Sequence, residues 1–193
     1  MEWSRRETSA QRSRRKGSLM RKSLWAAVAA MLAVAVMSSI ALAAVNVKSL
    51  PTATFSGASV TVTGGNFSGL GNVPAIATLT VTGSATFTCF NPQGHPSPGQ
   101  NPVPAQPGST DQDLGNSDHN GRGTITNMTA SVTAPSPPPS AQAVGCGGQG
   151  STQWTVVLNT LTATDAHLVI TQGGAIIFCR NYTLGGPATG TAC

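Results

Sequence analysis

Charged and aromatic side chains are scarce in this chain of 193 residues. Charged residues make up 9% of it and aromatic residues 5%, against about 25% charged residues in an average globular protein. The net charge of +5 comes from a basic stretch before residue 44. Beyond it, three cations, Lys48, Arg122 and Arg180, face four aspartates, which leaves a net charge of −1. Three scattered cations cannot neutralise a run of phosphates, so a nucleic-acid-binding surface is excluded for residues 44–193.

The usual signatures of a catalytic site are also missing. No glutamate follows the basic stretch, and three of the four aspartates crowd into one segment, which argues against the opposed carboxylates of a glycosidase. There is no Gly-x-Ser-x-Gly nucleophile turn. Asp118 beside His119, and Asp165 two residues before His167, would need a nucleophile held by a third element. We therefore expect a protein that is not an enzyme and has no cofactor.

The N-terminal segment has the pattern of an export signal. A basic stretch is followed by an apolar run at 24–37 and by an Ala-x-Ala triplet at 41–43. This order predicts a signal peptide over residues 1–43. The alternative is an uncleaved membrane anchor at 24–45, since the apolar character continues that far. Both interpretations place residues 44–193 outside the cytoplasm, in a secreted or extracellular location, and limit membrane contact to the N-terminal segment.

All four cysteines lie in the part predicted to be exported. An even count in an oxidising compartment favours disulfides over a metal site, and no Cys-x-x-Cys occurs. Of the three connectivities possible for four cysteines, we favour Cys89–Cys146, which would bridge strands flanking a long loop. Cys179–Cys193 would then pin a glycine-rich tail.

Alternation of apolar and hydroxyl side chains dominates residues 44–193. Over 77–89, odd positions are apolar or glycine and even positions are Thr or Ser, which predicts a long strand with one buried face, bent at Gly83. The dipeptide Gly173-Gly174 between two β-rich runs predicts a hairpin. Further strands are expected at 59–63, 124–133, 153–161, 166–172 and 175–182. The pattern predicts an all-β fold, a single antiparallel β-sandwich of about seven strands over 44–193.

Ten of the thirteen prolines fall in two segments, 90–121 and 135–140. We predict that both are loops with extended backbone, and that 90–121 is a functional surface or a disordered insertion. The longer segment contains Asp111, Asp113 and Asp118 beside a glycine, and these oxygen ligands make calcium a candidate cofactor. The spacing departs from an EF-hand loop, and a polar loop with Asx turns is the alternative.

A second candidate site is a platform of aromatic rings for stacking against sugars. Trp154 and Tyr182, with Phe90 as a third ring, are the residues that would form it. Trp154 shares its strand face with Val156 and Leu158, however, so the simplest interpretation places it in the core.

The stretch Cys89-Phe90-Asn91-Pro92-Gln93-Gly94, followed by a loop rich in Gly, Gln, Asn and Pro, resembles small exported β-proteins of GC-rich bacteria. The resemblance implies fold and location and supplies no catalytic residue. We expect a non-catalytic secreted or cell-surface protein with a structural or interaction role. The alternative is a carbohydrate- or calcium-binding module at the cell wall. Cell-wall polysaccharide or another surface protein is the expected partner, because hydroxyl-rich, nearly uncharged faces suit weak multivalent contacts.

Overall fold

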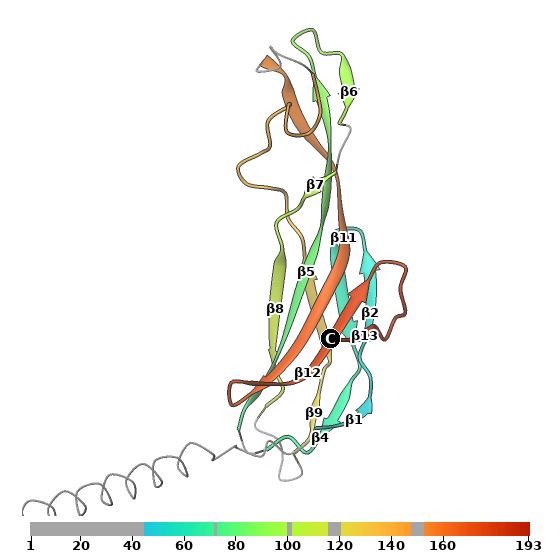
Figure 1. Cartoon of the computed structure of the whole chain (residues 1–193), viewed down its shortest axis with the longest axis vertical. Helices are drawn as coiled ribbons and strands as arrows, with labels where there is room; N and C mark the ends of the chain where they lie inside the picture. Colours follow the sequence, from blue (N-terminus) through green and yellow to red (C-terminus); the bar gives the residue numbers. More distant parts are fainter. Residues whose placement is uncertain (1–44, 72, 100–101, 116–120, 148–152) are drawn as a thin grey trace, which may run out of the picture. The chain divides into compact units, whose positions relative to one another are not determined.

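The computed structural model describes residues 45–193 except 72, 100–101, 116–120 and 148–152 (Figure 1). The chain divides into two units at Leu42/Ala43, and all described residues belong to the second. The signal peptide predicted at 1–43 therefore lies outside the described residues. Among the residues that are described, no helix is both long enough and apolar enough to cross a membrane.

The described residues form an all-β fold, as predicted, with thirteen strands in three antiparallel sheets. The largest sheet has the order β13-β12-β11-β5-β6, with β7 and β8 also paired to β5. The two smaller sheets have the orders β10-β3-β2 and β1-β4-β9. The strands are β1 (Asn46–Ser49), β2 (Thr52–Ser56), β3 (Ser59–Thr63), β4 (Asn66–Ser68), β5 (Ala75–Phe90), β6 (Pro96–Pro98), β7 (Val103–Pro104), β8 (Gly108–Asp113), β9 (Gly123–Thr124), β10 (Asn127–Ser131), β11 (Thr155–Gln172), β12 (Ala175–Thr183) and β13 (Thr191–Ala192).

Two long strands, β5 and β11, run side by side through the largest sheet (Figure 1). The alternation predicted for 77–89 is confirmed, because the odd-numbered side chains of β5 are buried and the even-numbered ones reach the surface. The two strands predicted at 153–161 and 166–172 form one continuous β11, whose register shifts twice against β5. Gly83 lies opposite Ala163 near one shift, where a Cβ would collide with the Thr162 carbonyl oxygen.

The prediction that 90–121 is one long loop is wrong for the described residues that form β6, β7 and β8. This segment turns back along β5 and pairs with it as β6, β7 and β8. Proline has no N–H to donate, so its strands are confined to sheet edges, and β6 and β7 contain prolines and pair with β5 alone. These three strands, together with other short ones such as β1, β4, β9 and β13, bring the number of strands to thirteen, against about seven expected.

The core lies between the largest sheet and the β10-β3-β2 sheet. Its fully buried side chains include Val60 and Val62 of β3, Leu79 of β5, and Leu168 and Ile170 of β11. The apolar faces of both sheets therefore contact each other, as in the predicted sandwich. A second, smaller cluster contains Ala85, Phe87, Cys89, Ala141, Val144 and Cys146.

The predicted hairpin and both expected disulfides are present. Gly173 and Gly174 join β11 to β12 with φ angles of 57° and 81°, a conformation that costs glycine least. Cys89 bonds to Cys146 inside the smaller cluster, with their Cα atoms 6.2 Å apart. Cys179 bonds to Cys193 with a Cα separation of 5.6 Å and ties the segment after Thr183 back to β12.

Candidate functional site

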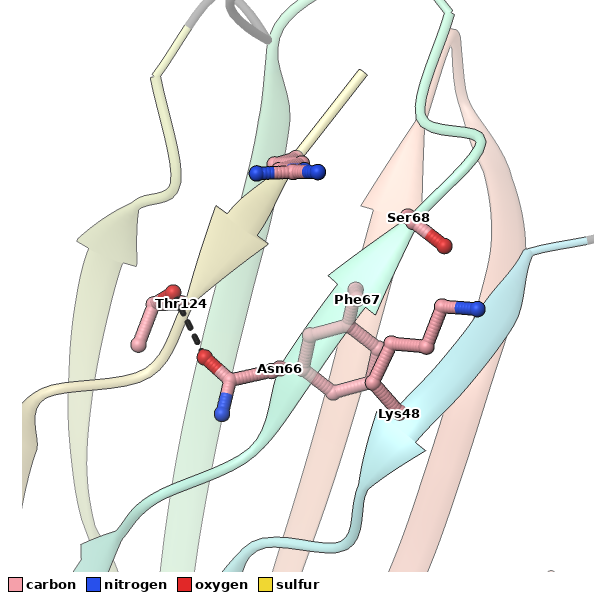
Figure 2. Close-up of a pocket in the computed structure, with 6 residues that line it drawn as sticks. Lys48, Asn66, Phe67, Ser68 and Thr124 are labelled. Carbon is pink, nitrogen blue, oxygen red and sulfur yellow. Dashed lines mark hydrogen bonds between the residues drawn. The ribbon is translucent and has the colours of Figure 1, made fainter. Parts of the chain in front are cut away.

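A groove formed by the β1-β4-β9 sheet collects cationic and polar side chains (Figure 2). It is lined by Lys48, Asn66, Phe67, Ser68, Arg122 and Thr124. Its volume of about 550 Å³ falls within the range of roughly 300–1,000 Å³ that is typical of small-ligand sites. The groove is therefore large enough to hold a sugar unit or a comparable polar group.

Strand pairing brings the lining residues together from distant parts of the chain. Asn66 lies opposite Ser49 on β1 and Thr124 on β9. The Thr124 hydroxyl donates to Asn66 Oδ1 at 2.9 Å, and Asn66 Nδ2 donates to Ser49 Oγ at 2.8 Å. Figure 2 shows Asn66 and Thr124 at one side of the groove and Lys48 at the other. The amide and hydroxyl groups are thus held in place by one another.

The base of the groove is fixed by the core. The Phe67 side chain is buried and packs edge-on against Phe178, with ring centroids 5.0 Å apart. Because a buried ring anchors β4 between β1 and β9, the polar neighbours Asn66 and Ser68 keep a defined position. A preformed polar site loses little freedom when it binds a ligand.

The charge of the groove is opposite to that of the rest of residues 44–193. Lys48 and Arg122 are two of the three cations in this part of the chain, and no carboxylate among the described residues lines the groove. The third cation, Arg180, donates from Nη1 to the Gly190 carbonyl oxygen at 3.2 Å. The groove is therefore a local positive site on a domain whose net charge is −1.

Sequence reasoning did not identify this groove. Lys48 and Arg122 lie far apart in the chain, and the strands that bring them together are only two to four residues long. Strands this short show no clear alternation. The one signal in the sequence was the scarcity of cations. With only three cations in residues 44–193, two of them in one groove are an unusual concentration of charge.

The calcium interpretation stays a prediction. Asp111 lies on β8 and accepts a hydrogen bond of 2.6 Å from the Thr78 hydroxyl of β5. Asp113 Oδ1 accepts from the Gly115 backbone N–H at 2.8 Å, which is an Asx turn. Asp118, the third predicted ligand, lies outside the described residues, as does His119. Both described carboxylates thus have hydrogen-bond partners within the chain.

The candidate platform for sugar stacking is not formed, and the alternative that places Trp154 against the core is confirmed. Tyr182 is only 1% exposed and belongs to the main core, where its hydroxyl donates to the Pro51 carbonyl oxygen at 3.4 Å. Trp154 packs against the smaller cluster around Cys89, as the phase of its strand indicated. Phe90 pairs with Thr155 at one end of β11, whereas Tyr182 pairs with Ala166 further along the same strand. The three rings therefore share no surface.

Burial of Tyr182 makes the stability of the domain depend on pH. Desolvation raises the pKa of this phenol from 10.0 to about 12, and the nearby positive charge of Arg180 opposes the shift. As the pH rises above 10 the unfolded chain loses this proton first, so stability should fall between pH 10 and 12 by on the order of 2–3 kcal/mol.

Tyr182 is the only tyrosine, so phenolate absorbance reports on it alone. We expect a titration midpoint near 12 in the folded protein and near 10 in urea, and Tyr182→Phe should flatten the alkaline loss of stability. A folded-state midpoint near 10 would contradict this.

Asp165 and His167 have different hydrogen-bond partners. Asp165 accepts from the Thr164 hydroxyl at 2.7 Å, whereas His167 Nδ1 lies 2.6 Å from Asn181 Oδ1. His167 instead lies beside Cys179 and Cys193, and one ligand atom from each of the three falls within 4.8 Å of the others. The two sulfurs are bonded to each other, however, and a metal would need them as thiolates.

Comparison with known proteins finds no matching family model, curated protein or solved structure. The resemblance of the Cys89–Gly94 stretch to exported bacterial β-proteins therefore stays a prediction.

Proposed function

We propose that the protein is a non-catalytic, exported component of the cell surface that binds acidic polysaccharide in the Lys48–Arg122 groove. The observation that carries this proposal is the position of two of the three cations of residues 44–193 in one polar groove. Cationic side chains beside hydroxyl and amide groups suit a glycan that carries carboxylate or phosphate groups. The disulfides support export, since such bonds persist in oxidising compartments.

The rest of the surface supports a structural rather than a catalytic role. Hydroxyl side chains on neighbouring strands bond directly to each other, as in Thr61–Thr129 at 2.9 Å and Thr86–Thr160 at 2.6 Å. Cross-strand pairs of this kind stabilise a sheet without any apolar contact. Where these pairs lie, the outer faces are polar and uncharged, which suits a protein that lies among hydrated polysaccharide chains.

Binding to glycans of different charge tests the proposal. Polygalacturonate is the anionic probe and dextran the neutral one, each titrated calorimetrically against the full chain at low and high salt. We expect binding to polygalacturonate that weakens with salt, and none to dextran, because screened charges attract less. Equal binding to both glycans, or binding to neither, would contradict the proposal.

Variants at Lys48 locate the binding to the groove. Lys48→Gln should weaken binding to polygalacturonate by about fivefold, the effect of roughly 1 kcal/mol from one exposed ion pair. Lys48→Arg keeps the charge on the exposed strand β1 and should bind as the parent does. If Lys48→Gln also binds as the parent does, the glycan contacts another face of the domain.

A further inference from the structure

The two disulfides differ in their access to solvent. Cys89 and Cys146 are 0% and 1% exposed, within the smaller apolar cluster. Cys193 is exposed and Cys179 is half-buried on the outer face of the largest sheet. A dissolved thiol can therefore reach the second bond without any opening of the fold, whereas the first bond is covered.

A histidine ring lies against the accessible bond. His167 Nε2 is 3.8 Å from Cys179 Sγ, and His167 Nδ1 is 3.8 Å from Cys193 Sγ. Cross-strand pairing places the ring there, because Val169 of β11 lies opposite Cys179 and His167 lies opposite Asn181. The side chains of His167, Cys179 and Asn181 thus share the outer face of the sheet.

Asn181 determines which ring nitrogen exchanges its proton. Asn181 Oδ1 lies 2.6 Å from His167 Nδ1, and an amide oxygen only accepts, so Nδ1 donates. The second proton of the imidazolium then resides on Nε2, the nitrogen that faces Cys179 Sγ. A proton donor is therefore positioned at the sulfur of Cys179.

We propose that the Cys179–Cys193 bond is a thiol–disulfide exchange site at which an external thiol attacks Cys193 and His167 protonates the departing sulfur of Cys179. The incoming thiolate forms a new S–S bond to Cys193 Sγ, and the Cys179–Cys193 bond breaks with its electron pair on Cys179 Sγ. Transfer of the Nε2 proton yields the Cys179 thiol and neutral His167. A second external thiol then attacks the external sulfur of the mixed disulfide and releases Cys193 Sγ, which takes up the proton of that thiol. The two external thiols leave as an oxidised dimer, so that two thiols are oxidised and one disulfide is reduced.

The surrounding contacts keep both cysteines close enough for the bond to form again. Ala53 N–H donates to the Ala188 carbonyl oxygen at 2.8 Å, and β13 pairs with β12 through Thr191 and Ala192. These contacts hold the segment after Thr183 against the sheet without the covalent bond. The reaction is independent of the proposed glycan binding, since the two sites have no residue in common.

Glutathione is a suitable probe for the full chain purified without reductant. The sample is quenched by alkylation at intervals, and peptide mass spectrometry reports the state of each cysteine. We expect the Cys179–Cys193 bond to open roughly a hundredfold faster than Cys89–Cys146, with the glutathione adduct on Cys193. Opening of both bonds at one rate, or an adduct on Cys179, would overturn the proposal, whatever the variants show.

His167→Gln tests the proton donor, and His95→Gln is its matched control. His95 is an exposed histidine in the turn after β5, where its backbone N–H bonds to Asn91 Oδ1. His167→Gln should slow the opening of Cys179–Cys193 by about tenfold or more, while His95→Gln should leave the rate unchanged. An unchanged rate in a folded His167→Gln variant would rule out the assigned role of the imidazole.

Discussion

Replacing Cys89 and Cys146 together by alanine is expected to lower the free energy of unfolding by about 4 kcal/mol. The bond closes a loop of 57 residues, and in the chain-entropy model a closure of this length restricts the unfolded chain by about that amount. The loss of stability should be greatest in the smaller cluster, where the disulfide lies among Phe87, Ala141 and Val144. Because typical domains are stable by only about 5–15 kcal/mol, a loss of this size removes much of the margin.

The second disulfide provides the matched comparison. Replacing Cys179 and Cys193 by alanine opens a closure of 14 residues and should cost about 3 kcal/mol, less than the first pair. Urea unfolding followed by far-UV circular dichroism gives the free energy of unfolding of both variants. Each variant needs its own m-value, because an unfolded chain without the disulfide is more expanded and exposes more surface. A larger loss from the second pair would show that surface contacts of the tail matter more than loop length.

Local sequence patterns predicted those parts of the fold that depend only on residues close together in the chain. The alternation in β5 follows from a period of two that leaves no choice about which side is buried. The β11–β12 hairpin follows from Gly173-Gly174, since two adjacent residues with positive φ are favourable for glycine. Both features depend on the order of neighbouring residues, so they are visible in the sequence.

The incorrect predictions of the fold concern strands whose own composition does not indicate a strand. The segment 90–121 has no apolar run and many prolines, so nothing in it reveals that β5 offers a free edge to β6, β7 and β8. Likewise, β11 continues through Ala163 because β5 supplies Gly83, whose missing side chain makes room for the shifted backbone. Such strands are stabilised by a partner rather than by their own composition.

The candidate site was hidden for the same reason. The sequence suggested the aspartates near Asp111 as calcium ligands and the rings of Trp154 and Tyr182 as a platform for sugars. The structure gives the described aspartates hydrogen-bond partners and buries Tyr182 in the core. The groove instead contains Lys48 and Arg122, which the pairing of the three short strands β1, β4 and β9 brings to one place.

Leu168→Ala is expected to destabilise the domain by about 3–4 kcal/mol, the range for deleting a fully buried leucine. Leu168 lies opposite Leu79 in the β5–β11 pair, and both side chains are 0% exposed between the two packed sheets. Leu184→Ala is the control, because Leu184 is 53% exposed and should change stability by less than about 0.5 kcal/mol.

The Leu79→Ala/Leu168→Ala pair tests whether the two leucines share one cavity. If they do, the double variant should cost less than the sum of the single ones, by at least about 0.5 kcal/mol, because the second truncation enlarges a space that is already open. Thermal or urea unfolding of the parent, the two single variants and the double variant gives the coupling directly. A Leu168→Ala variant as stable as Leu184→Ala would mean that the large sheet does not cover β3 and β10, and the sandwich itself would then be in error.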